Sequence, residues 1–334
     1  MSTTSIDRPA VDPADTTQDV AIQVRGVRKS YGDREVLRGI DLAVRPGEFF
    51  GILGPNGAGK TTLIEIIEGL RRPDSGDVEV LGASPHRRRS GLLRRVGVQT
   101  QKGAFFTRLT AREHLLTMAS LYRVSPGQAD RTLALVGLTG QGGVRVEKLS
   151  GGQKQRLAIA GALVHEPDVI FLDEPTAALD PQARRDLWTV LRDLRAQGRT
   201  IIYTTHHLDE AEALCDRVAI LVAGEIRALD TPHLLKASSH GLGQVRVPVG
   251  RLDPARGADL VGVVGIRTEG GALVLETERP SDVLLQVSEI CALDGVETRT
   301  PNLEDVYLEL TADQPEHTSQ HTSEHPSQHE EAVR

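Results

Sequence analysis

The sequence predicts an α/β domain with a largely parallel sheet, followed by a smaller α+β domain. Between residues 21 and 230, short apolar segments alternate with segments of helical periodicity, a pattern typical of parallel α/β folds. Beyond residue 240 the pattern changes to alternating apolar and polar strands with two helical stretches. The chain has 334 residues, which is long enough for one large domain and a second, smaller one.

The elements of the large domain follow one another in a strand–helix order. The first strands are rich in β-branched and aliphatic residues, and each later strand is short and bounded by turn residues. We expect strands at residues 21–27, 41–44, 48–53, 77–81, 169–172 and 200–204. We expect helices at residues 61–69, 110–137, 153–165 and 181–197.

The rest of the chain divides into an accessory region and two polar ends. Residues 1–20 are rich in Thr, Asp and Pro, and residues 313–334 in His, Glu and Ser, so we expect both to be disordered. An accessory α+β domain is expected over 241–312, with strands at 244–249, 272–277 and 296–299 and helices at 281–293 and 303–310. The repeated histidines of the tail could chelate a metal ion, although an inert tail is the favoured interpretation.

Charge and composition exclude several function classes. The formal net charge is −7, and the net charge of residues 1–20 and 313–334 accounts for all of it. Residues 21–312 are therefore neutral overall and lack the net positive charge typical of nucleic-acid-binding proteins. Two cysteines do not make a disulfide framework. No apolar run approaches the roughly 18 residues of a membrane-spanning helix, and no secretory signal opens the chain. We therefore expect a cytoplasmic protein.

A phosphate-binding loop lies between the strand at 48–53 and the helix at 61–69. It matches the pattern G-x-x-x-x-G-K-[ST], in which backbone N–H groups and a helix N-terminus surround phosphate oxygens. Lys60 is expected on the β- and γ-phosphates, and the Thr61 hydroxyl on Mg²⁺. The predicted nucleotide-binding residues are Gly54, Pro55, Asn56, Gly57, Ala58, Gly59, Lys60, Thr61 and Thr62.

Two carboxylates follow the buried strand at 169–172. Ligands bind at the carboxyl ends of strands in open α/β sheets, so Asp173 and Glu174 are expected beside the phosphate loop. Asp173 suits Mg²⁺ coordination and Glu174 suits polarising an attacking water. These two motifs indicate a nucleoside triphosphatase.

A second anion-binding segment precedes the helix at 153–165. It consists of Leu149, Ser150, Gly151, Gly152 and Gln153, and its serine and glycine amides stand at a helix N-terminus. One nucleotide does not need two phosphate-binding loops. The economical interpretation is that each loop serves one face of a nucleotide held between two chains.

With these motifs, residues 21 to about 235 resemble the ATP-binding cassette (ABC) ATPase family. Leu149–Gln153 is similar to the family's signature motif without alteration. The resemblance implies a P-loop NTPase (RecA-like) cassette over 21–240 with a helical subdomain at 103–165. It also implies ATP and Mg²⁺ as ligands, and two subunits that pair head to tail around two ATP.

The resemblance assigns further residues by their order along the chain. Gln101 corresponds to the glutamine that contacts metal and water, with Gln99 as a nearby competitor. Asp180 corresponds to the D-loop aspartate, although Ala rather than Ser or Gly stands two residues before it. His206 corresponds to the switch histidine, with His207 the less favoured candidate, and Tyr31 to the aromatic that stacks on adenine.

The resemblance also implies how the protein works. The segment 302–310 is similar to the C-terminal segment of the daunorubicin-resistance type, which powers export of hydrophobic drugs, antibiotics or lipid-like compounds. The partner would be a separate permease of about six membrane spans, with this chain held on the inner face of the membrane. Two alternatives stay open: an importer ATPase, and a non-transport ABC ATPase acting on DNA or ribosomes.

Overall fold

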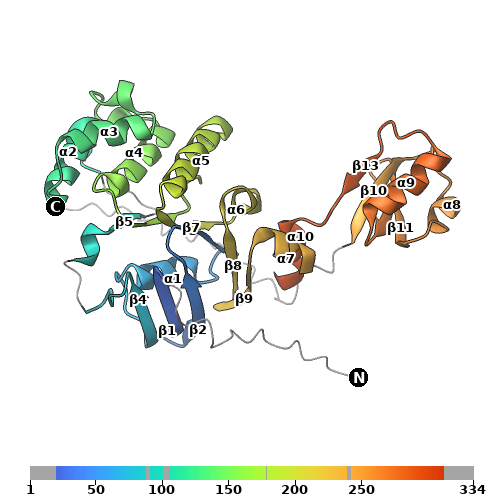
Figure 1. Cartoon of the computed structure of the whole chain (residues 1–334), viewed down its shortest axis with the longest axis horizontal. Helices are drawn as coiled ribbons and strands as arrows, with labels where there is room; N and C mark the ends of the chain where they lie inside the picture. The colour runs from blue at the N-terminus through green and yellow to red at the C-terminus, as the bar shows by residue number, and fades with distance from the viewer. Residues whose placement is uncertain (1–19, 88–90, 101–104, 178, 239–241, 312–334) are drawn as a thin grey trace, which may run out of the picture.

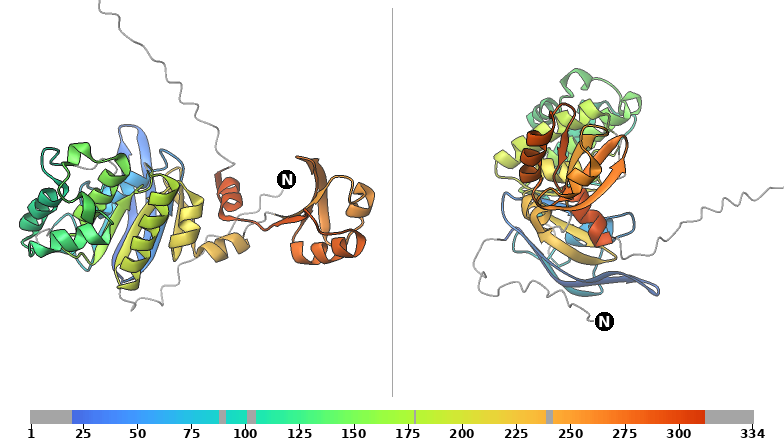
Figure 2. Two further views of the ribbon diagram at one scale, coloured as in Figure 1. Left: turned by 90° about the horizontal axis from the view of Figure 1, so that it is seen from above. Right: turned by 90° about the vertical axis from the view of Figure 1, so that its right-hand side faces the viewer.

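The structure is a computed structural model that describes residues 20–87, 91–100, 105–177, 179–238 and 242–311. The ends expected to be disordered lie outside these ranges, apart from Val20. Figure 1 shows a large body and, at its side, a smaller body built from residues 243–299. The turned views of Figure 2 show the same separation.

A six-stranded sheet forms the centre of the large body. Its strand order is β5-β6-β7-β3-β8-β9, and all neighbours are parallel except β8 and β9, which pair antiparallel. The strands are β3 (Phe49–Leu53), β5 (Val96–Gln99), β6 (Val169–Asp173), β7 (Thr200–Thr205), β8 (Arg217–Val222) and β9 (Glu225–Asp230). The predicted α/β fold with a largely parallel sheet is confirmed.

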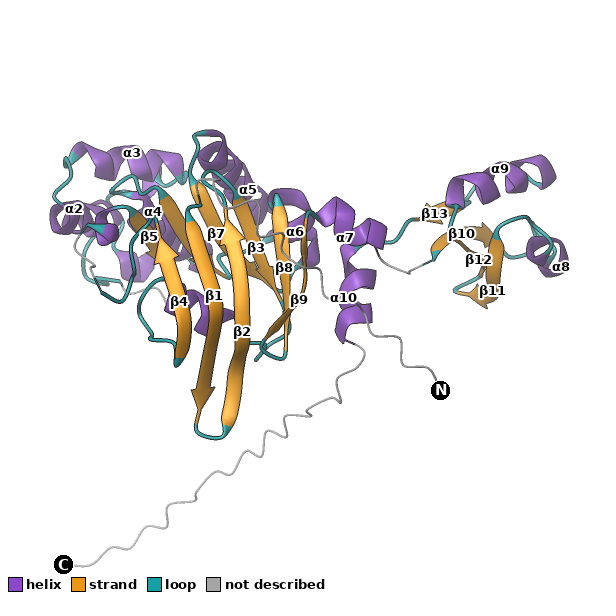
Figure 3. Ribbon diagram, turned by 60° about the horizontal axis from the view of Figure 1, so that its bottom comes forward, coloured by secondary structure: helices purple, strands orange, loops and turns teal. Residues whose placement is uncertain are grey.

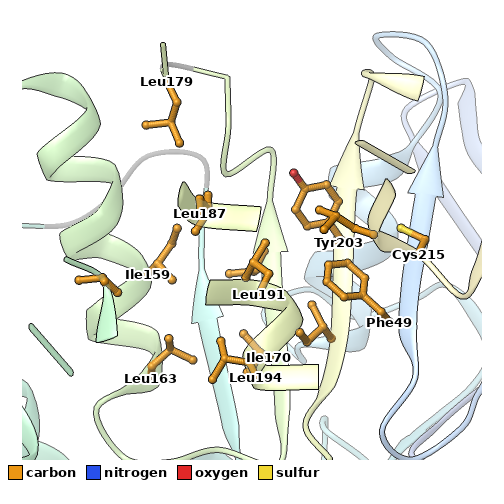
Figure 4. Close-up of a cluster of buried hydrophobic side chains, with 14 of the residues drawn as sticks. Phe49, Ile159, Leu163, Ile170, Leu179, Leu187, Leu191, Leu194, Tyr203 and Cys215 are labelled. Atoms are coloured by element: carbon orange, nitrogen blue, oxygen red, sulfur yellow. The ribbon is translucent and has the colours of Figure 1, made fainter. Parts of the chain in front are cut away.

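Every residue of β3 is buried, because both faces of the central sheet are covered. Phe49 and Leu53 point into one core, and Phe50 and Ile52 point into the other, as the two-residue period of a strand requires. Figure 4 shows part of the first core, where Leu187, Leu191 and Leu194 of α5 (Pro181–Ala196) face Ile170 of the sheet.

The second core lies between the central sheet and a three-stranded antiparallel sheet. This sheet has the order β2-β1-β4 and consists of β1 (Ile22–Tyr31), β2 (Arg34–Val44) and β4 (Ser75–Val80); it stands at the front in Figure 3. α1 (Lys60–Ile67) contributes Leu63 and Ile66 to the same core. β1 and β2 are longer than the strands expected from the sequence because they form a continuous hairpin through Gly32, whose φ is 57°.

Three helices form a subdomain beside the central sheet: α2 (Ala111–Tyr122), α3 (Gly127–Leu135) and α4 (Gly151–Leu163). The continuous helix expected over 110–137 is broken, since Arg123 has left-handed backbone and Pro126 follows it. A capping box fixes the start of α2, in which Thr110 and Glu113 exchange hydrogen bonds. Short 3₁₀ helices lie at Leu92–Arg94, Thr139–Gln141 and Val146–Lys148.

The smaller body is an antiparallel sheet covered by two helices. Its strand order is β11-β12-β10-β13, and its own core includes Val245, Leu275 and Val287. The elements are β10 (Gly243–Pro248), α8 (Pro254–Ala258), β11 (Val263–Glu269), β12 (Ala272–Thr277), α9 (Pro280–Ile290) and β13 (Glu297–Arg299). The pattern did not predict β11, whose side chains are mostly exposed.

The last described helix returns to the large body. α10 (Leu303–Thr311) packs against α6 (Leu208–Leu214) and α7 (Pro232–Ser238), and its Leu303 and Val306 belong to the first core of the cassette. The sequence grouped residues 303–310 with the accessory domain instead. The grouping differs because an amphipathic helix shows which face is apolar but not which body covers that face.

Candidate functional site

The phosphate loop joins β3 to α1 and is built around a close approach of backbone to backbone. A Cβ atom on Gly54 would lie 2.2 Å from the carbonyl oxygen of Leu221, so no larger residue fits there. Gly57 and Gly59 have φ values of 80° and 107°, in the left-handed region that favours glycine. This backbone path leaves the N-terminus of α1 free to face a ligand.

Lys60 is the first residue of α1 and its side chain is 6% exposed. Its Nζ donates hydrogen bonds to the carbonyl oxygens of Gly54 and Pro55, at 2.7 and 3.2 Å, which holds the ammonium inside the loop. Burial lowers the Lys60 pKa, and the neighbouring carboxylates Glu174 and Asp173 act in the opposite direction. A buried cation inside a phosphate-sized loop fits a polyphosphate ligand.

Asp173 ends β6 and is buried. Its Oδ1 accepts a hydrogen bond of 2.5 Å from the Thr204 hydroxyl, which in turn accepts the backbone N–H of Glu174 at 3.0 Å. Burial is the main reason that the Asp173 pKa is raised. Carboxylate and hydroxyl oxygens are the ligands that Mg²⁺ prefers, so the donor set of Asp173 and Thr61 fits that cation.

Glu174 follows Asp173 with a φ of 46°, a conformation that costs a non-glycine residue about 1–3 kcal/mol. The strained backbone turns its carboxylate towards the phosphate loop, where Oε1 lies 3.8 Å from Lys60 Nζ. The same oxygen lies 3.4 Å from Nδ1 of His206, which follows β7. Three residues far apart in the sequence therefore meet at one point.

An open cavity of about 270 Å³ adjoins this point. Its walls include Tyr31 at the β1–β2 turn, the phosphate loop and Glu174. Tyr31 is 42% exposed, and the guanidinium of Arg71 stands over its ring at 5.2 Å from the centroid. The remaining wall residues are Arg34, Val36, Pro55, Asn56, Gly57, Gly59, Lys60, Thr61 and Thr62.

Arg34 is a wall residue that the sequence did not point to. An ideal Cβ on Gly57 would lie 3.6 Å from its guanidinium, so the charge faces the phosphate loop. In the described part of the chain, this guanidinium has no hydrogen-bond or ion-pair partner. No motif contains Arg34. Its position three residues after Tyr31 was the only feature of the sequence that could have suggested a place at the site. Thr204, which holds Asp173 and Glu174, was likewise missed.

The residues 149–153 do not line this cavity. Ser150 is the N-cap of α4: its hydroxyl accepts the N–H of Gln153, and its own N–H donates to Gln153 Oε1. Space is open around Gly151, where an added Cβ would meet no atom within 4 Å. The second anion-binding segment is thus an exposed helix N-terminus, separate from the phosphate loop of its own chain.

The remaining predicted residues have mixed outcomes. Asp180 is the N-cap of α5 and accepts the N–H groups of Ala183 and Gln182; these hydrogen bonds lower its pKa. Gln101 lies outside the described residues, so the choice between Gln101 and Gln99 stays open. Gln99 is buried and its amide nitrogen donates to the carbonyl of Thr100. The ring of His207 contacts that of His206, with centroids 4.2 Å apart.

Known proteins are similar to this chain in sequence and in fold. The family model described as ABC transporter matches residues 37–177. The chain is 40% identical over 299 residues to a Nod factor export ATP-binding protein I of Rhizobium meliloti (strain 1021), covering 87% of this chain and 88% of that protein. The chain belongs to the ABC transporter ATP-binding family. This ABC ATPase is also 39% identical over 299 residues to the protein of that name from Burkholderia orbicola (strain AU 1054), with 87% and 96% coverage.

Solved structures agree with the fold of this ABC ATPase. An ATP-binding subunit of an ABC transporter matches with a TM-score of 0.60 and 29% identity, covering 65% of this chain and 92% of that one. A dimeric ATP-binding cassette in a post-hydrolysis state, bound to ADP and Pi, matches with a TM-score of 0.58 and 29% identity, covering 63% and 98%. The prediction of an ATP-hydrolysing cassette is confirmed, and ABC ATPase subunits dimerise and act with membrane components.

Within the described ranges, no helix of this ABC ATPase is long and apolar enough to cross a membrane. The daunorubicin-resistance type named by the resemblance is not among the relatives reported above, which carry the name of Nod factor export.

Proposed function

We propose that this chain is the ATP-hydrolysing subunit of an exporter that moves a hydrophobic drug, antibiotic or lipid-like substrate through a separate permease. One observation carries the direction of transport. The export proteins align over 299 residues, which exceeds the cassette and extends into the accessory region, whereas the two solved cassettes cover about two thirds of the chain. Similarity over the accessory region supports a function shared with export ATPases, not only a shared ATPase domain.

The chemistry follows from the meeting of Lys60, Glu174 and His206. ATP would place its phosphates in the loop 54–61, with the charge of Lys60 on the β- and γ-phosphates and the adenine against Tyr31. Glu174 Oε1 would accept a proton from the water that attacks the γ-phosphorus in line. His206, 3.4 Å from that oxygen, would hold the carboxylate and the γ-phosphate together, and Gln101 would contact the same water.

A magnesium ion would neutralise charge on the transferring phosphate. Thr61 lines the cavity, and Asp173, whose Oδ1 is hydrogen-bonded to Thr204, lies close enough to Lys60 to influence its charge. Oxygens of Thr61 and Asp173 would hold the ion, and the third expected ligand is Gln101. Within the chain, Lys60 and the loop N–H groups orient the phosphates, while the closing of two subunits excludes bulk water.

The site of one chain is incomplete, because residues 149–153 do not reach its cavity. We infer that two copies pair head to tail, so that Ser150 and Gly151 of one copy close the cavity of the other. The exposed N-terminus of α4 and the free space around Gly151 support this pairing. Asp180 at the neighbouring N-terminus of α5 would line the same interface.

The permease, of about six spans, would hold the pair on the inner face of the cell membrane. The helical subdomain is the expected contact with it. Export is tested in inverted membrane vesicles that contain the chain and a co-expressed permease of about six spans, with a fluorescent hydrophobic drug as the probe. ATP-dependent uptake into these vesicles is expected from the native chain and not from Glu174→Gln. Release from preloaded vesicles, driven by ATP, would instead identify an importer.

A further inference from the structure

The inference concerns α10 and its contact with α6. The buried face of α10 consists of Leu303, Val306, Tyr307 and Leu310, a spacing that places all four on one side of the helix. These side chains pack against the first core of the cassette, to which α6 and α7 contribute Leu214 and Leu235. Although the accessory domain lies between α7 and α10 in the sequence, α10 is therefore part of the cassette in space (Figure 1).

Glu212 on α6 fixes the start of α10. Its Oε1 accepts the backbone N–H of Leu303 at 2.9 Å, a group that has no partner within its own helix. Its Oε2 lies 3.6 Å from Nζ of Lys236 on α7. A single carboxylate thus joins the three helices at the point where the chain leaves for the accessory domain and returns from it.

The opposite side of α6 carries Glu210, which is fully buried. Its Oε2 accepts hydrogen bonds from the hydroxyls of Tyr203 and Thr205, both at 2.7 Å. The Thr205 hydroxyl also accepts the backbone N–H of His207 at 2.9 Å. Through Glu210, α6 is therefore hydrogen-bonded to the end of β7 and, by way of Thr205, to the backbone of His207.

The two residues between β7 and α6 are His206 and His207, and His206 reaches Glu174 Oε1 across 3.4 Å. α6 has only seven residues, so Glu210 and Glu212 are held on one rigid element. We propose that Glu212 is a positioning residue for His206: by holding α10 on one side of α6, it sets the place of the histidine loop on the other. This rests on ATP hydrolysis at the proposed site and not on the direction of transport.

The accessory domain is connected to the same contact. Arg299 of β13 forms an ion pair with Asp305 of α10 at 3.0 Å. Asp305 also exchanges hydrogen bonds with Asn302, which caps α10 just before Leu303. A displacement of the accessory sheet would therefore act first on the start of α10, and through Glu212 on the histidine loop.

The test measures steady-state ATP hydrolysis and ADP affinity of the full chain. Glu212→Ala should lower kcat by about threefold or more while the Kd for ADP changes by less than about twofold, because Glu212 does not line the cavity. Glu212→Gln keeps an oxygen acceptor for the Leu303 N–H and should restore most of kcat. Glu304→Gln removes an exposed carboxylate from the first turn of α10 and serves as the control, with native kcat expected.

A double-mutant cycle separates positioning from general destabilisation. In a His206→Ala background, Glu212→Ala should produce no further loss in single-turnover hydrolysis, since the effect passes through His206. NMR signals of the His206 ring should shift with Glu212→Ala and stay in place with Glu304→Gln. An equal loss in both backgrounds, an unchanged kcat for Glu212→Ala, or full activity of His206→Ala would each overturn the proposal. None of these outcomes bears on vesicle export, which is measured separately.

Discussion

At the scale of single residues, the site depends on a strained glutamate. Glu174 has left-handed backbone, and its N–H is held by Thr204, so its carboxylate has a fixed place beside Lys60 and His206. Strain of this kind persists only where the surroundings hold it. A substitution that keeps the shape of Glu174 should therefore change the chemistry and little else.

Glu174→Gln is expected to bind ATP with near-native affinity and to hydrolyse it at least about 100-fold more slowly, because an amide cannot accept the proton of water. ATP should also hold the variant as a dimer, since the proposed interface reopens after hydrolysis. Turnover and mass with ATP present check both statements. Glu79→Gln, on an exposed position of β4, is the control and should behave as the native chain.

Arg34→Ala tests the wall residue that no motif contains. Loss of a charge that faces the phosphate loop should weaken ATP and ADP binding by about tenfold, and less at high salt, because this charge is partly open to solvent. Calorimetric titration at two salt concentrations measures it. Arg25→Ala removes an exposed arginine of β1 and should leave affinity unchanged. Equal affinities for Arg34→Ala and the native chain would remove Arg34 from the site.

At the scale of elements, the C-cap of α1 is Glu68, a residue with an unusual pKa. Burial, with smaller effects of Asp173 and Glu65, raises the pKa of Glu68 from 4.5 to about 8. An acid whose pKa is raised on folding holds its proton in the folded chain after the unfolded chain has lost it. It therefore costs stability progressively as the pH rises from about 4.5 to about 8.

Glu68→Gln should remove this dependence. We expect the free energy of unfolding to increase by about 2–4 kcal/mol at pH 9 and to change little at pH 4. Denaturant titrations at both pH values, without nucleotide, measure the difference. Glu79→Gln is again the control, and a gain of equal size at pH 4 and pH 9 would show that ionisation of Glu68 is not the cause.

At the scale of the whole molecule, the proposed pairing can be tested by complementation. Ser150→Arg should bind ATP at its own loop but prevent closure, because the long side chain occupies the place of the partner's γ-phosphate. Lys60→Ala should bind ATP about 10-fold or more weakly and fail to turn over. A mixture of the two inactive chains should regain hydrolysis, since each mixed pair contains one intact site. A mixture as inactive as its components would contradict head-to-tail pairing.

Because α10 packs on the cassette, a truncation that removes α10 should have a different effect from a deletion of the accessory domain alone. Ending the chain at Ser238 removes Leu303 and Val306 from the cassette core and should lower stability by about 2–5 kcal/mol. Replacing only residues 242–300 by a short Gly/Ser linker keeps α10 on α7 and should leave unfolding and ATP binding near native. Thermal unfolding and ATP titration of both forms make the comparison. Equal stability of the two forms would show that α10 does not support the cassette.

Features of the fold and the site that depend on local chemistry could be predicted from the sequence. The alternation of short buried strands and helices defined the α/β fold, because each pattern has its own period. The phosphate loop at Gly54–Thr61 and the acidic strand end at Asp173 could be predicted because the chemistry of phosphate binding depends on residues next to one another in the chain. The segment at 149–153 was recognised as a helix N-terminus for the same reason.

Features that depend on contacts between distant segments could be found only in the folded chain. Arg34 joins the site through the β1–β2 hairpin, and Thr204 reaches Asp173 from a neighbouring strand, so neither has a signal in its own segment. α10 has an apolar face that either body could have covered, and only packing on α6 and α7 assigned it to the cassette. Amphipathic periodicity indicates that one face of a helix is buried. It does not indicate which element covers that face, because this depends on the packing of segments far apart in the chain.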